Sequence, residues 1–202
     1  MKAYSIAQVL VGITAVVAVM VGAASARADT IATFADPASD GSTPLFAFDG
    51  ASLFFTGGWS GSGLTLQTPG LPAPDFPDAT FTMAPVPVVQ VYPGLYLASA
   101  GAIQFYDSAS NPIWRIDFDS ALLNGSLSFG ASDFIGQNVT FSGSIIPTPL
   151  SDEAFAFSFA NPIATPNGFT VTAAFTSSAV PEPASLALIA LSAVGTLLGR
   201  RR

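Results

Sequence analysis

Regular alternation of apolar and polar residues is the feature of this sequence that most constrains its fold. In Ala154 to Phe159 three phenylalanines occupy every second position, and in Phe169 to Thr176 an apolar series alternates in the same way with threonines. Successive side chains of a β-strand point to opposite faces, so each segment would bury one face and expose the other. The pattern therefore predicts β-strands, and no stretch has the period of an amphipathic helix of useful length.

Similar short segments recur along the chain, separated by Gly, Pro, Asn and Asp. Asp49-Gly50 and Asn124-Gly125 are typical of tight hairpin turns, and the proline-rich stretch Pro69 to Pro77 indicates a surface loop. Roughly a dozen short strands are typical of two-sheet sandwiches and jelly rolls. We therefore expect an all-β fold, with a single β-sandwich or jelly-roll-like domain over residues 29–179.

Two features of the composition exclude whole classes of function. The sequence has no Cys and no His, which removes disulfides, thiolate nucleophiles, the usual zinc sites and any triad with an imidazole base. Between Asp29 and Val180, Arg115 is the one cation beside twelve acidic residues, so this region has a formal charge of −11. Such a charge repels a phosphate backbone and excludes nucleic acid as a partner.

The N-terminus has the three parts of a secretory signal peptide. Met1-Lys2 is positive, Ile6 to Val21 is apolar, and small residues follow up to Ala28. Signal peptidase accepts only small side chains at two positions before the cut, which Ala26 and Ala28 supply. We expect a signal peptide over residues 1–28 with cleavage before Asp29; a cut after Ala26 and a retained membrane anchor are the alternatives.

The C-terminus combines an extended tripeptide, an apolar run and a cationic end. Pro181-Glu182-Pro183 precedes Ala184 to Leu198, and the chain ends in Arg200, Arg201 and Arg202. The apolar run would span about 22 Å as a helix, less than the roughly 30 Å of a bilayer core. The arginines favour the cytoplasmic side, which places the preceding domain outside. We expect a short transmembrane helix over residues 184–199.

This order of a Pro-Glu-Pro motif, an apolar helix and an arginine cluster resembles the PEP-CTERM sorting signal of Gram-negative bacteria that secrete exopolysaccharide. The resemblance covers residues 180–202 alone. It implies recognition and processing by an exosortase, a membrane-embedded cysteine protease, after signal peptidase has acted. It also implies a precursor held transiently in the inner membrane and a mature form at the cell surface or in the extracellular matrix. An ordinary tail anchor is the alternative.

A calcium site is one candidate within the domain. In Trp114 to Asp119 the alternation puts Arg115, Asp117 and Asp119 on one face. Calcium prefers six to eight oxygen ligands, so Asp117 and Asp119 can share an ion, with loop carbonyls or Asp107 completing its shell. The simpler interpretation is that Arg115 neutralises the acids beside it on a solvated face, and we expect no other cofactor.

A glycan-binding site is the second candidate. Trp59 lies in the glycine-rich stretch Gly57 to Gly63, and Tyr92 and Tyr96 flank Pro93-Gly94-Leu95. Exposed aromatic rings in loops can stack on sugar rings because they present a broad apolar plane with a polar edge. The alternative is that Trp59 covers the end of the core.

Paired carboxylates are the remaining arrangement that permits general acid and base catalysis. Asp152 and Glu153 are adjacent and would point apart, while Asp75 and Asp78 lie in the proline-rich loop. Nothing places two acids across a cleft. We therefore expect a non-enzymatic protein with a structural or interaction role linked to exopolysaccharide or biofilm, with a glycan-binding module as the alternative and a glycoside hydrolase as a distant one.

Overall fold

Ten β-strands make up the regular structure of the residues that the computed structural model describes, which are 28–125, 132–146 and 150–181. These residues contain no helix, and the predicted all-β class is confirmed. The strands are β1 (Asp29–Phe34), β2 (Phe46–Asp49), β3 (Phe54–Trp59), β4 (Thr80–Tyr92), β5 (Leu95–Ala98), β6 (Gly101–Tyr106), β7 (Pro112–Asn124), β8 (Asp133–Ser142), β9 (Leu150–Thr165) and β10 (Gly168–Pro181).

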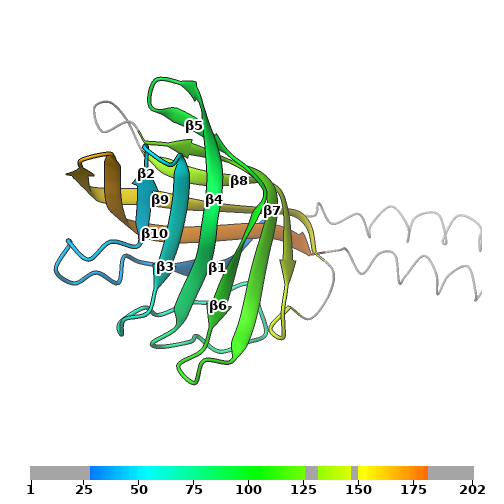
Figure 1. Cartoon of the computed structure of the whole chain (residues 1–202). Helices are drawn as coiled ribbons and strands as arrows, with labels where there is room; N and C mark the ends of the chain where they lie inside the picture. The colour runs from blue at the N-terminus through cyan, green and yellow to red at the C-terminus, as the bar shows by residue number, and fades with distance from the viewer. Residues whose placement is uncertain (1–27, 126–131, 147–149, 182–202) are drawn as a thin grey trace, which may run out of the picture. The chain divides into compact units, whose positions relative to one another are not determined.

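The strands form a closed barrel, and the predicted β-sandwich or jelly roll is wrong (Figure 1). Antiparallel pairing runs from β10 through β2, β3, β4, β5, β7 and β8 to β9, and β9 pairs again with β10. β1 and β2 lie end to end along β10, and β5 and β6 lie end to end between β4 and β7. Ten strands therefore fill the eight positions of the barrel.

The long strands β9 and β10 explain why one sheet closes instead of splitting into two. They pair along most of their length, with register shifts between Thr170 and Thr172 and between Ser178 and Val180. Such irregularities bend a strand and increase its twist, so one strand can follow the curvature of a barrel. Alternation of apolar residues is the same in a barrel and a sandwich, and for this reason the pattern did not distinguish them.

Aromatic side chains fill the interior of the barrel. Trp114, Phe81 and Phe157 are fully buried, and Phe157 lies 4.8 Å, ring centre to ring centre, from both Phe46 and Phe175. An eight-stranded barrel is just wide enough to be filled by side chains, and large rings fill it with few residues. The fully buried rings are Phe34, Phe46, Phe55, Phe81, Phe105, Trp114, Phe134, Phe157 and Phe175.

Both predicted membrane-directed segments lie outside this part of the chain. The signal peptide, apart from Ala28, and the helix of residues 184–199 belong to residues that the structure does not describe. Within the described ranges there is no helix of the length and hydropathy needed to cross a bilayer.

Candidate functional site

The two ends of the barrel domain lie side by side. β1 begins at Asp29, the residue after the predicted signal cleavage, and Asp29 pairs with Ala179 near the end of β10. β10 ends at Pro181, the first residue of the Pro-Glu-Pro motif, which pairs with Leu150 of β9. The first residue of the sorting motif is therefore also a residue of the last strand of the barrel.

Hydrogen bonds hold the end of β10 on both sides. Ser177 is almost fully buried, and its Oγ accepts from the Ala32 N–H and donates to the Ala32 carbonyl, each at 3.0 Å. On the other edge the Ser151 hydroxyl donates to the Val180 carbonyl at 3.3 Å. Ala179 has no exposed surface. The residues just before the motif thus belong to the packed domain.

The contact between β8 and β9 has two parts, a short ladder and a side-chain hydrogen bond nearer the start of β9. Among the residues that the structure describes, β8 pairs with β9 at Asp133, Phe134 and Ile135. Further along, the Glu153 carboxylate bridges the two strands by accepting a hydrogen bond from the Phe141 N–H at 3.0 Å. Partial burial raises the pKa of Glu153, and this hydrogen bond opposes the rise.

The partly buried Glu153 carboxyl predicts a specific pH dependence of stability. Because the folded-state pKa of Glu153 lies above the ordinary value of 4.5, its ionisation disfavours the folded state as the pH rises above that value. Glu153→Gln keeps an oxygen for the Phe141 N–H and removes the charge. We expect the stability of the variant to fall slightly less than that of wild type between about pH 4.5 and pH 7, measured by urea unfolding. Parallel pH profiles of wild type and variant would contradict this role.

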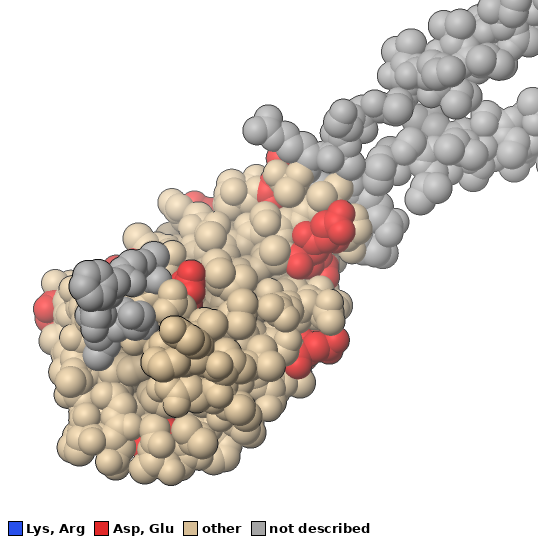
Figure 2. All heavy atoms as spheres, turned by 90° about the horizontal axis from the view of Figure 1, so that it is seen from above, with Lys and Arg blue, Asp and Glu red and all other residues tan. Residues whose placement is uncertain are grey.

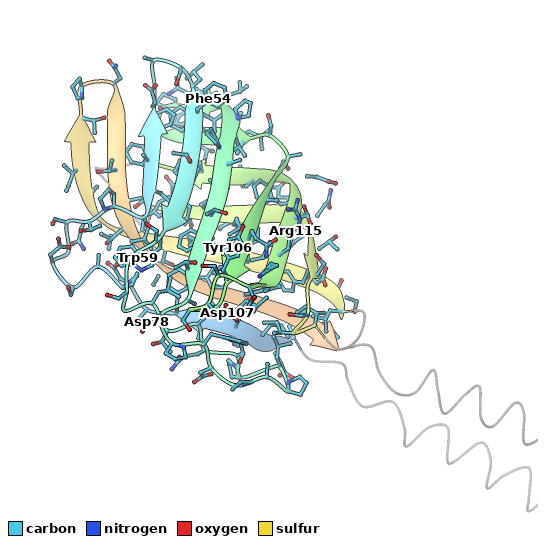
Figure 3. The ribbon with its side chains drawn as sticks, turned by 60° about the horizontal axis from the view of Figure 1, so that its bottom comes forward. Phe54, Trp59, Asp78, Tyr106, Asp107 and Arg115 are labelled. Carbon is cyan, nitrogen blue, oxygen red and sulfur yellow. The ribbon has the colours of Figure 1, made fainter. Side chains whose placement is uncertain are left out.

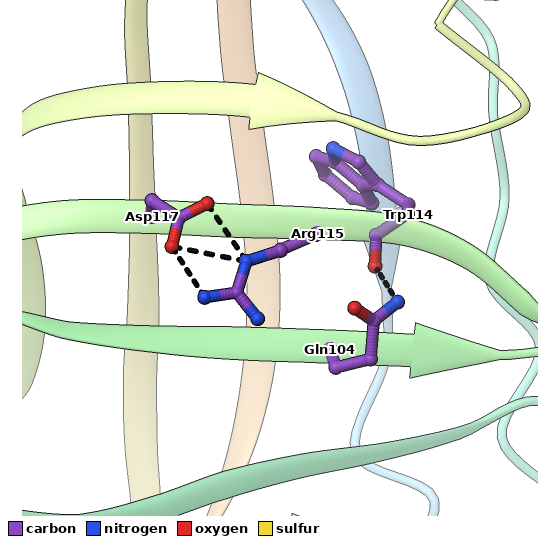
Figure 4. A network of polar contacts seen from close by, with 4 residues as sticks. All are labelled: Gln104, Trp114, Arg115 and Asp117. Carbon is purple, nitrogen blue, oxygen red and sulfur yellow. Dashed lines mark hydrogen bonds and ion pairs between the residues drawn. The ribbon is translucent and has the colours of Figure 1, made fainter.

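Of the three candidate calcium ligands, Asp117 and Asp119 line one surface depression, and Asp107 lies apart from it. Arg115 and Asp117 form an ion pair on the outer face of β7, with Nη2 and Oδ1 2.7 Å apart, beside the bond from Gln104 to the Trp114 carbonyl (Figure 4). Asp119 accepts from the Asn138 side chain at 3.2 Å. Asp107 lies in the β6–β7 turn, where it accepts from Asn111 and from the Ala109 N–H. The described ranges hold no cluster of three metal-binding side chains.

Thermal unfolding tests the calcium hypothesis directly. With Asp107 apart from Asp117 and Asp119, we expect the melting temperature to change little between millimolar calcium and chelator. A ligand that binds only the folded state raises the melting temperature by mass action, so a large increase with calcium would contradict this expectation. Asp117→Asn with Asp119→Asn is the control that would assign such an increase to this face.

The candidate aromatic residues also separate. Trp59 is the last residue of β3 and pairs with Phe81 of β4. Tyr92 is the last residue of β4, eleven residues beyond Phe81, and this separation along the strand is about 36 Å. Trp59 packs against the core at that end of the barrel, opposite the labelled Phe54 (Figure 3), and its indole N–H is buried without a partner in the described ranges. Tyr92 is 71% exposed, and the Tyr96 ring contacts Phe48 at 4.7 Å. Trp59 and the tyrosines therefore form no common site.

A surface groove contains an aromatic residue that the sequence analysis missed. It has a volume of about 660 Å³, and Phe54, 40% exposed, stands at one side of it. Adjacent residues in a strand point to opposite faces, so the pair Phe54-Phe55 already indicates one outward ring. The other lining residues are Ala47, Phe48, Asp49, Ser52, Thr56, Pro85, Thr165, Pro166, Asn167, Phe169 and Thr170.

The acidic side chains are dispersed over the barrel. Figure 2 shows them in separate groups between wide uncharged areas of the face in view. Several cap turns of their own loops: Asp40 accepts from the Ser42 and Thr43 N–H groups, and Asp49 from the Ala51 N–H. The hydrogen bonds from Ser42 and Thr43 lower the pKa of Asp40. The pKa of Asp49 is lowered first by the Ser52 hydroxyl, which donates to its carboxylate, and then by the Ala51 N–H. These acidic side chains therefore stabilise the turns of the fold.

Comparison with known proteins identifies the tail. A family model of the PEP-CTERM protein-sorting motif matches residues 179–202, which confirms the resemblance predicted from the sequence. The match begins at Ala179, within β10. No curated protein and no solved structure matches the chain. The chain carries an exosortase sorting signal, and it is an exported protein made as a membrane-anchored precursor.

Proposed function

We propose that this is a non-enzymatic protein of the cell surface or extracellular matrix, in which the barrel has a structural or interaction role linked to exopolysaccharide. The observation that carries the proposal is the sorting motif, which matches residues 179–202 and starts inside the last strand. The barrel is thus the part that sorting delivers.

The filled barrel interior and the structural contacts of the acidic side chains support a non-enzymatic role. Aromatic rings occupy the barrel interior, the place where larger barrels hold ligands. Asp40, Asp49 and Asp107 cap turns, Asp117 pairs with Arg115, and Glu153 bridges β8 and β9. Each of these carboxylates has a structural partner.

Deletion of the gene tests this proposal. We expect the deletion strain to form less biofilm or to retain less exopolysaccharide at the surface. Complementation with wild type should restore the phenotype, whereas a chain truncated after Pro181, which keeps the barrel but lacks the tail, should not. An unchanged matrix in the deletion strain would refute the link to exopolysaccharide.

Glycan binding is the second candidate function, and the groove beside Phe54 is the observation that favours it. An exposed ring with hydroxyl and amide groups around it suits a sugar ring. In a polysaccharide pull-down, the Phe54→Ala variant should then lose most of the binding that wild type shows. Trp59→Ala is the matched test of the site predicted from the sequence, and Tyr92→Ala tests the exposed tyrosine. Equal retention by all three variants would exclude these sites, and release of sugars from the polysaccharide would indicate a hydrolase instead.

A further inference from the structure

The end of β4 reaches past the strand that covers one of its sides. β3 begins at Phe54, which pairs with Pro87 of β4. β4 continues to Tyr92 with β5 on its other side, so the β4–β5 hairpin extends beyond the end of β3 (Figure 1). In the described residues no strand pairs with β4 on the β3 side beyond Pro87. Residues 88–92 therefore form an open edge of the sheet, the β4 edge.

The β4 edge lacks the charges and prolines that usually protect an open edge from pairing with another chain. Its sequence is Val-Val-Gln-Val-Tyr, and four of these five residues belong to the types that favour strands. A register shift against β5 between Gln90 and Tyr92 increases the twist there and keeps the regular part of the edge short. The edge can therefore accept one short strand.

Two other strand segments that have a neighbour on one side only, within the described ranges, do carry such protection. The last part of β9 contains Asn161, with a φ of 50°, and Pro162. In β8, Asn138 also has a φ of 50°, and the Glu153 carboxylate takes the N–H of Phe141. These features distinguish both segments from the β4 edge.

Exposed apolar side chains gather at the β4 edge. The described residues include eight large hydrophobic side chains that are exposed, and five of them lie on this edge or beside it at the start of β3. These five are Leu53, Phe54, Val89, Val91 and Tyr92, with exposures from 40% to 71%. A concentration of exposed apolar surface marks a site of interaction.

The distribution of charge favours a second copy of the chain as the partner. Residues 29–180 have a formal charge of −11, so two copies repel each other wherever their acidic side chains come close. No charged residue occurs between Asp78 and Asp107, a range that contains all of β4, β5 and β6. A cationic partner would bind most strongly at the acidic parts of the surface, whereas two identical acidic domains approach best where charge is absent.

The backbone of β4 defines the register of such a pair. The Val88 N–H points toward the β3 side, where it donates to the Leu53 carbonyl at 2.9 Å. Backbone groups two residues apart in a strand point to the same side, so Gln90 presents its N–H and carbonyl on the open side. Two directly opposed residues of this kind exchange both hydrogen bonds in an antiparallel pair.

We propose that two copies of this chain pair through their β4 edges, antiparallel and about a two-fold axis at Gln90. Val89 of one copy is then opposite Val91 of the partner subunit, which covers two exposed aliphatic side chains. The Gln90 side chains are opposite each other, and an amide both donates and accepts hydrogen bonds. Each copy uses the same edge, so the contact is self-complementary and closes as a dimer.

A single cysteine tests the contact in the full-length protein. The chain has no Cys, and opposed residues of a hydrogen-bonded antiparallel pair lie about 5.5 Å apart at Cα, within the range of a disulfide. After mild oxidation of intact cells, most of the Gln90→Cys protein should migrate as a dimer on a non-reducing gel, and reductant should return it to monomer.

Thr82→Cys is the matched control for this experiment. Thr82 is exposed on the same strand, but it pairs on both sides, with Gly58 of β3 and Gln104 of β6. It should therefore remain monomeric under the same oxidation. Equal amounts of disulfide-linked dimer in the two variants would overturn the inference, because random collision would then explain both.

Charge pairs at Gln90 test the two-fold register independently. Two differently tagged full-length wild-type copies should co-purify. When both copies carry Gln90→Glu, or both carry Gln90→Lys, like charges face each other and co-purification should fall by roughly tenfold or more. One copy with Gln90→Glu and the other with Gln90→Lys should restore it.

The restoration separates a lost contact from a misfolded variant, since neither single change could regain binding if it unfolded the barrel. Thr82→Glu in both copies is the control and should co-purify like wild type. Wild-type copies that do not co-purify would overturn the inference. A Glu–Lys combination no better than either like-charged pair would also overturn it.

Discussion

Replacement of Pro181, Glu182 and Pro183 together by alanine is expected to abolish processing of the tail almost completely. The two prolines fix φ and keep the residues before them extended, and alanine removes both constraints while leaving the apolar run and the arginines intact. The precursor should still insert, and its larger form should accumulate in the inner membrane. Fractionation with mass spectrometry measures this in a host that encodes an exosortase, beside the same host lacking it.

The structure supplies the control for this variant. Pro181 lies in β10 but has no backbone N–H to donate to the sheet, so alanine at this position should leave the barrel folded. Thermal unfolding of the variant should match wild type, which separates a defect in recognition from a defect in folding. A normally processed triple variant would show that the Pro-Glu-Pro motif is not what the protease reads.

The arginine cluster is expected to act differently. Neutral residues at Arg200, Arg201 and Arg202 remove the charges that resist translocation, so retention and orientation of the precursor should weaken while the motif itself stays intact. The two variants therefore distinguish recognition from anchoring. If both gave the same accumulation in the inner membrane, these two roles would not be separate.

Local patterns predicted the faces of the strands, and long-range pairing decided what they assembled into. Phe155 and Phe157 do point into the core, as their spacing requires, and Asp49-Gly50 does begin the turn between β2 and β3. The barrel depends on the ladder between β9 and β10 and on its register shifts. Which strands pair is a relation between segments distant in sequence, and residue alternation within a segment does not determine it.

Local sequence was likewise not enough to predict which candidate site residues lie together. Trp59 and Tyr92 each fit an aromatic platform by local sequence, yet they lie at opposite ends of the strand pair β3–β4. β4 runs without interruption from Thr80 to Tyr92 through Pro85 and Pro87, although proline is normally confined to edge strands and bulges. The sorting tail was recognised because its signal is contiguous in sequence and needs no tertiary arrangement.

Substitution of Phe157 by alanine is expected to destabilise the barrel by about 3–5 kcal/mol. Phe157 has no exposed surface, and its ring contacts those of five other phenylalanines at centre-to-centre distances from 4.8 to 6.1 Å. These neighbours are Phe34, Phe46, Phe81, Phe155 and Phe175, which come from β1, β2, β4, β9 and β10. The loss is large because one side chain joins strands from opposite walls of the barrel, and rings fixed by several neighbours collapse little into the space left behind.

A domain of ordinary stability has about 5–15 kcal/mol in total, so Phe157→Ala should leave the exported barrel marginally folded and reduce its yield. Urea unfolding of the purified domain measures the change. Phe54→Ala is the matched control, since it removes the same atoms from a ring that is 40% exposed and should cost roughly 1 kcal/mol or less. Equal losses at the two positions would contradict the inward orientation of Phe157, and with it the register of β9 against β10 on which closure of the barrel depends.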